Sequence, residues 1–417
     1  MPAHAGASSP GSSMRITNRW AILAIVIVAT TIGMMSFAAP FALLPVWIRE
    51  LGLTKAQGGL LSGLWYLPGI VVALPAGWLF DRFPARRVML VLWVLIFLGM
   101  GSMAMASSFV ALCVGRFVFS VGMNAHMVGA PKVLGNWFAG RRELGFVMGL
   151  YTLAFTAGVF LSLNILGRIG ETRGSAPALL LLAALSGVGF ALLTLIPGAP
   201  DESARSISVV GHAARDVAPP PFRPWALGAG VWVLAIAYFG YSIGTEAYLT
   251  FTPDLLVGRG LALTLASSTV GAYAPIAFVL KPILSSFLTR ARAPWFAAAA
   301  TAAALASIAL LFSGAPPLVS AAAMGVSLAL GMPSLMSLPN YLLPPSKSGQ
   351  AYGLYQLLYS LGFLAQPLVG AAVDRTGSYS AGFMVIAAYT AIGFAVVLPI
   401  VRRLVSVPVS SNSPSTT

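Results

Sequence analysis

Apolar runs of about 20 residues recur along the whole chain, and they limit its possible folds more than any other feature. A helix of that length crosses the roughly 30 Å hydrocarbon core of a bilayer. The chain of 417 residues is 58% hydrophobic and only 8% charged, with a mean hydropathy of +0.88. A soluble core cannot hide so much apolar surface, so we expect the solvent around most of the chain to be lipid.

The runs predict twelve spans, and each must be a helix because a lipid-exposed span has to satisfy its backbone hydrogen bonds internally. The predicted fold class is therefore an all-α membrane protein with twelve transmembrane helices. We expect the spans near residues 20–43, 58–80, 88–106, 109–136, 144–167, 176–197, 225–251, 263–288, 295–313, 316–342, 351–373 and 380–401.

One segment is spelled twice at a fixed offset. "GLYTLAFTAG" begins at Gly149, and "GLYQLLYSLG" begins at Gly353, 204 residues later. The offset is close to half of the 417 residues, which predicts two related halves of six spans. Two parallel six-helix repeats are the design of one large class of secondary transporters.

A polar, proline-rich stretch separates the two halves and predicts a flexible linker. The polar leader lacks a convincing cleavage signal, so we expect it to be a tail and not a removed signal peptide. The predicted organisation is an N-terminal cytoplasmic tail at 1–19, an N-terminal six-helix bundle at 20–196, a cytoplasmic linker at 197–224, a C-terminal six-helix bundle at 225–401 and a cytoplasmic C-terminal tail at 402–417.

The net charge of +14 is a topology signal and not a sign of nucleic-acid binding. With the N-terminus inside, most basic residues fall on inner segments, which is the bias that orients membrane proteins. We therefore expect a prokaryotic cytoplasmic (inner) membrane protein with both termini cytoplasmic, and we expect a monomer. The single cysteine, Cys113, excludes a disulfide within the chain. We expect no metal, no cofactor and no enzyme activity, because no ligand cluster or nucleophile–base spacing stands out.

Three motifs resemble those of the major facilitator superfamily. "GWLFDRFPARR", from Gly77 to Arg87, resembles its loop between spans two and three. "GRFVFSVGMNAH" resembles its span-four arginine motif, and "PLVGAAVDRTGSY" its end of span eleven. The resemblance covers all twelve spans and implies alternating access around a central cavity. Two departures are a loop longer by one residue at Pro84 and Ala85, and a loop between spans eight and nine without the family's Gly and Asp.

The resemblance further implies an inner latch, a charge network that ties the two halves together while the cavity faces outward. The alternative is a set of charges that only turns the loop and follows the positive-inside bias. The predicted latch residues are Gly77, Asp81, Arg82, Arg86 and Arg87.

Ionisable residues inside spans are functional candidates by default. Glu246 is the one acidic residue well inside a predicted span, and Arg116 lies at a similar depth in span four. Since the family's spans four and seven line the cavity, the two charges could form an outer gate, or Glu246 could carry a coupling proton. The plain alternative is a glutamate in water at the outer rim.

Lys281 in "AFVLKPILSSF" is the clearest substrate candidate. It lies about 13 Å from Arg290 at the inner end, at about 1.5 Å per residue, and so close to the bilayer midplane. There it would attract an anion if it faced an aqueous cavity, as in the carboxylate and oxalate transporters that this span resembles. Alternatively it snorkels toward lipid headgroups.

Other candidates are neutral or weakly basic. His126 and Asn124 in span four could bind substrate or serve packing, and the doubled segment places polar-aromatic faces on spans five and eleven. Together with Lys281 and Arg116, the predicted substrate contacts are His126, Asn124, Tyr151, Tyr241, Tyr355 and Gln356.

The sequence thus predicts a secondary active transporter for a small carboxylate-like or inorganic anion, driven by protons or by anion exchange. "GAPKVLGNWFAGRRELG" resembles nitrate, nitrite and cyanate porters, but span two has no arginine for a paired-arginine nitrate clamp. There is no G-x-x-x-x-G-K-[Ser/Thr] loop, so ATP is not the expected energy source. The rival is proton-driven efflux of hydrophobic or cationic compounds, in which Glu246 would carry the proton and recognise the cation.

Overall fold

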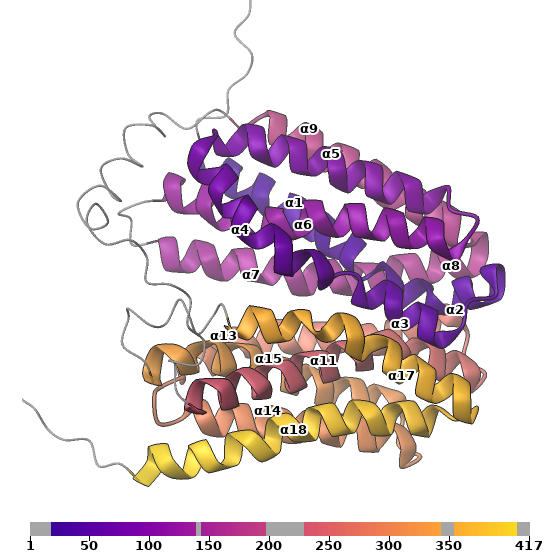
Figure 1. The fold of residues 1–417 in the computed structure, drawn as a ribbon, viewed down its shortest axis with the longest axis vertical. Helices are drawn as coiled ribbons and strands as arrows, with labels where there is room; N and C mark the ends of the chain where they lie inside the picture. The colour runs from indigo at the N-terminus through magenta and orange to yellow at the C-terminus, as the bar shows by residue number, and fades with distance from the viewer. Residues whose placement is uncertain (1–17, 139–142, 197–228, 343–353, 407–417) are drawn as a thin grey trace, which may run out of the picture.

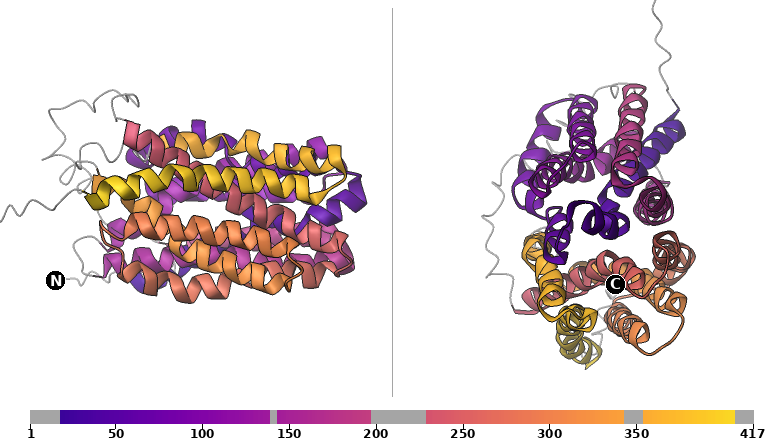
Figure 2. Two further views of the ribbon diagram at one scale, coloured as in Figure 1. Left: turned by 90° about the horizontal axis from the view of Figure 1, so that it is seen from below. Right: turned by 90° about the vertical axis from the view of Figure 1, so that its right-hand side faces the viewer.

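The chain folds into helices only, over the residues that its computed structural model describes: 18–138, 143–196, 229–342 and 354–406. Figure 1 shows two layers of helices that lie one above the other with their long axes running in the same general direction. Figure 2 shows the same two groups end-on. We call them the N-terminal bundle, formed by residues 18–196, and the C-terminal bundle, formed by residues 229–406.

The N-terminal bundle contains a π-helical turn, Ser162–Leu166, within its fifth span. Its α-helices are α1 (Arg19–Phe37), α2 (Ala39–Leu51), α3 (Lys55–Gly63), α4 (Leu67–Arg82), α5 (Ala85–Ala104), α6 (Phe109–Trp137), α7 (Leu144–Leu161), α8 (Gly167–Arg173) and α9 (Ser175–Thr194).

The C-terminal bundle repeats this pattern of long and broken helices. Its helices are α11 (Ala229–Gly258), α12 (Leu263–Gly271), α13 (Tyr273–Ser286), α14 (Ala293–Phe312), α15 (Pro317–Leu342), α17 (Gly362–Thr376) and α18 (Tyr379–Ser406). The span that contains α17 begins at Leu354, and a turn at Leu361 interrupts it.

Within the described ranges, nine helical segments are long and apolar enough to cross a membrane. The first of them, Arg19–Leu51, joins α1 and α2. The predicted class, an all-α membrane protein, is confirmed. The expected tails and the linker at 197–224 fall almost entirely outside the described residues.

In three of the broken spans a proline closely follows the break. Pro40 stands in the first turn of α2 and Pro68 in the first turn of α4. Pro275 follows the break at Ala272 between α12 and α13. Proline has no N–H to donate to the preceding turn, so each break leaves backbone carbonyls that need other partners.

The two bundles meet most closely at one end of the molecule, on the right of Figure 1, which we call the closed end. Here α3 and α12 begin, and α8 and α17 finish. The contact is backbone against backbone: a Cβ built on Gly59 would lie 2.5 Å from the Gln366 carbonyl oxygen, and one on Gly370 would lie 2.1 Å from that of Lys55. Only glycine permits this approach.

Candidate functional site

Glu246 lies on α11 between the two bundles and is held by two tyrosines. Its Oε2 accepts a hydrogen bond from the Tyr66 hydroxyl, and its Oε1 accepts one from the Tyr359 hydroxyl at 2.6 Å. Tyr66 belongs to the break between α3 and α4, and Tyr359 to the helix that begins at Leu354. The carboxylate is therefore a polar bridge between the bundles in the middle of the protein.

Aromatic rings surround this carboxylate. Tyr66 and Tyr359 pack edge to face with ring centroids 4.9 Å apart, and Tyr238 lies 5.7 Å from Tyr359. Glu246 itself is only partly buried, so part of its surface remains accessible to solvent between these rings.

Arg116 is fully buried, and its guanidinium donates hydrogen bonds to three backbone carbonyls. Nε donates to Leu61 at 3.2 Å, Nη1 to Ser36 at 3.0 Å and Nη2 to Phe37 at 2.8 Å. These carbonyls lie at the two helix breaks: Pro40 has no N–H for Ser36, and the Trp65 N–H turns to Ser62 instead of Leu61.

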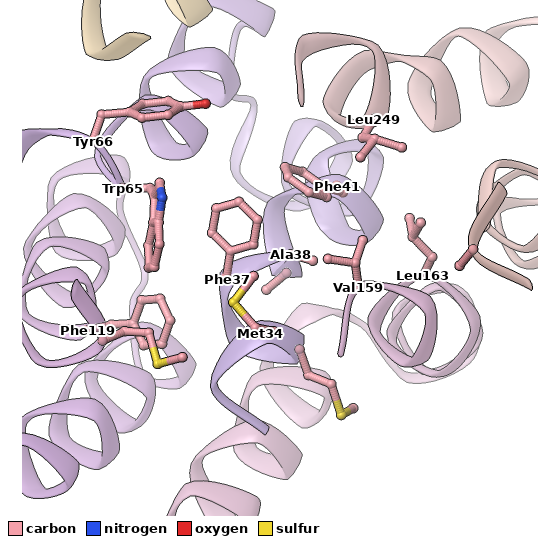
Figure 3. Packing of buried hydrophobic residues seen from close by; sticks show 14 of the residues in the cluster. Met34, Phe37, Ala38, Phe41, Trp65, Tyr66, Phe119, Val159, Leu163 and Leu249 are labelled. Carbon is pink, nitrogen blue, oxygen red and sulfur yellow. The ribbon is translucent and has the colours of Figure 1, made fainter. Parts of the chain in front are cut away.

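The predicted gate between Arg116 and Glu246 is not formed in this structure. No ion pair joins them, since the guanidinium is held at the breaks of spans one and two and the carboxylate by tyrosines. Figure 3 shows the aromatic residues near these breaks: Trp65 lies above Phe119 and beside Phe37, and the ring of Tyr66 lies above Trp65.

Asn124 also serves a broken helix. Its Nδ2 donates to the Trp65 carbonyl at 3.1 Å and to Ser120 at 2.9 Å. Its Oδ1 faces Gly69, where a Cβ would lie 3.4 Å away, and Gln356 Nε2 approaches the same point at 3.2 Å. Because both amides lie near Gly69, the structure brings these two predicted substrate contacts together across the bundle interface. Gln356 is also exposed.

His126 is buried and bonded at both ring nitrogens. Nε2 lies 3.0 Å from the Thr30 hydroxyl, and Nδ1 accepts a hydrogen bond from the Trp93 indole at 3.1 Å. Since Trp93 can only donate, Nδ1 carries no proton and Nε2 donates to Thr30. The ring joins three helices and has no nitrogen left for a substrate in this state.

The three predicted tyrosines are buried and lie apart from one another. Tyr241 donates to the Ser327 carbonyl at 2.8 Å within the C-terminal bundle. Tyr151 contacts the sulfur of Met127 at 3.7 Å within the N-terminal bundle. Tyr355 stacks on Tyr238 with centroids 5.0 Å apart, next to the ring of Tyr359. Of the three, Tyr355 therefore lies nearest to the Glu246 site.

Lys281 is partly buried on α13 and makes no hydrogen bond or ion pair with any residue in the described ranges. It shares a helix face with Ala274 and Ala277, which are both buried. That helix packs on α15 and also contacts α7 of the N-terminal bundle. The lysine therefore lies on the same side of α13 as two buried alanines, in a helix that contacts both bundles.

The predicted inner latch lies at the end of the molecule opposite the closed end. Arg82 is exposed and stacks over Trp78 at 5.5 Å, and Arg86 donates to the Thr194 carbonyl at 2.6 Å within the same bundle. Arg87 is exposed. Gly77 and Asp81 belong to α4, but their side-chain surroundings lie outside the described residues, so the latch stays a prediction.

The cross-bundle ion pair that the structure does contain was not predicted. Lys55 Nζ lies 2.6 Å from Asp254 Oδ2 at the closed end and 2.8 Å from the Tyr379 hydroxyl. One sequence signal was available: Thr54 and Gln57 form a capping box, which marks a helix that starts at Lys55. Nothing local in the sequence indicated which residues face that helix start.

Comparisons with known proteins agree with this architecture. A sequence model described as Major Facilitator Superfamily matches residues 25–367 and 234–416. A lysosomal dipeptide transporter of Danio rerio is 25% identical over 358 residues, covering 81% of this chain and 77% of its own length. A probable sulfoacetate transporter of Cupriavidus necator is 25% identical over 407 residues, covering 91% and 93%.

Solved structures show the same fold at low identity. A peptide transporter in complex with sulfate superposes with a TM-score of 0.71 at 15% identity, covering 92% of this chain and 95% of the other. A nucleoside transporter gives a TM-score of 0.72 at 13% identity, covering 93% and 100%. The broken helices, the paired bundles and the sequence match lead to one conclusion: this chain belongs to the Major Facilitator Superfamily, and it is a transporter and not an enzyme.

Proposed function

We propose that the protein is a proton-coupled secondary transporter of small organic acids that works by alternating access. The observation that carries this proposal is Lys281, a partly buried cation on a helix that contacts both bundles, with no hydrogen-bond or ion-pair partner in the described ranges. Even partial burial of an unpaired cation is costly unless an anion neutralises it. A carboxylate substrate would do so and would be selected by the same charge.

Several relatives are transporters of acids or inorganic anions, which supports an acidic substrate. Besides the sulfoacetate transporter, a putative tartrate transporter of Agrobacterium vitis is 23% identical over 383 residues. A nitrite extrusion protein of Bacillus subtilis is 24% identical over 377 residues. Among these, we propose organic carboxylates for the present chain, because Lys281 offers a single cation and not a paired-arginine clamp.

Glu246 fits the role of the proton carrier. As a carboxylate it accepts charge-assisted hydrogen bonds from Tyr66 of one bundle and Tyr359 of the other, and such bonds are stronger than neutral ones. A proton on its Oε2 would weaken the link to Tyr66 and so loosen a contact between the bundles. It would also remove a negative charge that opposes an incoming anion.

The predicted topology assigns each end of the molecule to one side of the membrane. If both termini are cytoplasmic, the start of α3 and the end of α17 lie outside, and the closed end faces the exterior. The structure then corresponds to a state shut toward the outside, in a prokaryotic inner membrane. The two bundles at 20–196 and 225–401 would be the units that rock against each other.

Proton-driven efflux of organic cations is the second candidate. It is favoured by the tyrosine rings around Glu246, because aromatic faces and a carboxylate together recognise ammonium groups. In that reading Glu246 binds the cation or the proton in turn, and Lys281 is dispensable.

Uptake into proteoliposomes tests the two candidates directly. Labelled mono- and dicarboxylates and labelled organic cations are offered under an imposed proton gradient. For an acid transporter, Lys281→Gln should lower carboxylate uptake by about 10- to 100-fold, because a charged hydrogen bond is worth about 1.5–3 kcal/mol and 1.4 kcal/mol is tenfold. Arg290→Gln, nine residues further along and exposed, is the matched control and should keep full uptake.

The Glu246→Gln variant completes the test. It should lose accumulation driven by the proton gradient but keep counterflow exchange, since the anion site is intact. Full carboxylate uptake by Lys281→Gln would end the organic acid proposal. Cation transport that depends on Glu246 and not on Lys281 would establish the efflux candidate instead.

A further inference from the structure

Two carboxylates at the closed end cap helices of the opposite bundle. Asp374 lies in the last turn of α17, and Glu171 in the last turn of α8. A negative charge is unfavourable at the C-terminal end of its own helix. Each carboxylate therefore needs a positive partner elsewhere, and each finds the N-terminus of a helix in the other bundle.

Asp374 reaches from the C-terminal bundle to the start of α3. Its Oδ1 accepts the Lys55 N–H at 3.0 Å, and its Oδ2 accepts the Ala56 N–H at 2.8 Å. These are among the first N–H groups of α3, which have no acceptor within the helix. The cap of Thr54 satisfies the next one, the N–H of Gln57.

Glu171 reaches in the reverse direction, from the N-terminal bundle to the start of α12. Its Oε2 accepts the Thr264 N–H at 2.9 Å and the hydroxyl of the same residue. The 204-residue offset of the internal repeat relates Glu171 to Arg375, the neighbour of Asp374, so the two caps lie at nearly equivalent places in the two halves. Together they form a reciprocal pair.

A third contact lies beside the Asp374 cap. Lys55 Nζ pairs with Asp254 Oδ2 at 2.6 Å and lies 4.6 Å from the centre of the Tyr379 ring. The Tyr379 hydroxyl donates to Asp254 Oδ2 at 2.8 Å. With Asp374 on one side and Asp254 on the other, the positive start of α3 is matched by two carboxylates of the opposite bundle.

We propose that Asp374 and Glu171 form a reciprocal double latch that holds the closed end shut. The ion pair between Lys55 and Asp254 strengthens the contact beside Asp374. Opening this end separates both carboxylates from the helix starts that they cap and leaves each beside the unfavourable end of its own helix. The latch goes beyond the proposed function, since it would act for any substrate.

Accessibility of one buried position tests the latch. Ser267 on α12 is fully buried, and its Oγ would lie 2.8 Å from a Cβ on Gly167 of the other bundle. In a Cys113→Ser background, Ser267→Cys places a small thiol in this interface. A membrane-impermeant maleimide should label it slowly, and we expect labelling about five- to tenfold faster in Asp374→Ala or Glu171→Ala and faster again in the double variant.

The matched control is Glu50→Ala. Glu50 also caps a helix at this end, by accepting the N–H of Ser175 at 3.2 Å, but within its own bundle. Its removal should leave the labelling rate unchanged. Intact cells and inverted vesicles are both labelled, so that the orientation of the protein does not decide the result.

Folding is checked by size-exclusion chromatography before labelling. If an alanine variant does not fold, Asp374→Asn or Glu171→Gln replaces it in the labelling experiment. Labelling at the wild-type rate in the folded latch variants would overturn the proposal. An equal acceleration in Glu50→Ala would overturn it too, because general loosening would then explain the effect. Neither result depends on the substrate, so the latch and the proposed function fail independently.

Discussion

Arg116 illustrates how a charge can be buried for a structural reason. It is fully buried, but three carbonyls at two helix breaks surround its guanidinium, and the rings of Phe37 and Phe119 lie 5.9 and 5.2 Å from it. The planar fork of donors matches carbonyls from separate segments, which a lysine ammonium cannot do. The residue that the sequence offered as a substrate ligand is held by the backbone in this state.

Arg116→Lys should therefore destabilise the fold. We expect a loss of about 2–4 kcal/mol in the free energy of unfolding, because at least one buried carbonyl loses its donor at about 1–3 kcal/mol each. The apparent unfolding temperature in detergent measures it. The exposed Arg82→Lys is the control, and equal unfolding temperatures for both variants would contradict this assignment.

His126 gives a second residue-scale prediction. Its two nitrogens are taken by Thr30 and Trp93, so His126→Phe should lower the unfolding temperature by leaving both partners unsatisfied. The KM for substrate should stay within about twofold, because no substrate contact is lost. A large rise in KM in a variant of unchanged stability would instead show that the histidine binds substrate in another state.

Among single residues, charged side chains within spans could be recognised from the sequence as site candidates, whereas the tyrosine that binds Glu246 from the other bundle could not. Glu246 and Lys281 could be selected from the sequence because ionisable groups are rare in spans. Tyr66 could not, since its hydroxyl is one of many in apolar runs and its partner lies 180 positions away. Asp374 is an acid in the last turn of its own helix, which is unusual enough to suggest a partner elsewhere. The helix that it caps is distant in the sequence, so that partner could not be identified.

At the scale of elements, the closed end depends on glycines where helices cross. A Cβ at position 370 would fall 2.1 Å from the carbonyl oxygen of Lys55, which is backbone and cannot move aside. Gly370→Ala should therefore force α17 away from α3 and increase labelling of a cysteine at position 267 by about tenfold or more.

The control for this change is Gly101→Ala. Gly101 also lies in a helix, but a Cβ there would meet nothing within 4 Å. It should leave both labelling and unfolding temperature near their original values. A Gly370→Ala protein that labels as slowly as the Gly101→Ala protein would show that the helices part elsewhere.

The helices themselves were largely predictable, and their interruptions less so. Length and hydropathy located the spans, since crossing a bilayer leaves little freedom in either. The first expected span ended at residue 43, whereas α2 continues to Leu51 after a break at Ala38. A proline such as Pro40 shows that one hydrogen bond is missing, but whether the helix stops, bends or resumes depends on what satisfies the carbonyls.

At the scale of the whole molecule, the proposed alternating-access cycle requires the closed end to open in every turnover. A covalent link across that end should therefore stop turnover. Cysteines at positions 171 and 264, joined by a short bis-maleimide in a Cys113→Ser background, replace the Glu171 contact with a bond. Uptake should fall to the level of empty liposomes after linking, and the same variant without the linker should still transport.

Either single-cysteine variant treated with the linker is the control and should retain transport. Continued uptake by the doubly linked protein would mean that this end does not move. The division into two bundles followed from the repeat at Gly149 and Gly353, but their relative placement did not. It is set by contacts such as Lys55 with Asp254, between residues almost 200 positions apart, which no local pattern indicates.

The three carbonyls bound by Arg116 have a consequence for how the protein moves. Breaks in spans one and two look like hinges, yet one guanidinium on α6 ties both breaks to the same helix. Bending at either joint would strip a buried cation of its ligands. We therefore expect both breaks to stay rigid and the N-terminal bundle to move as one unit relative to the C-terminal bundle.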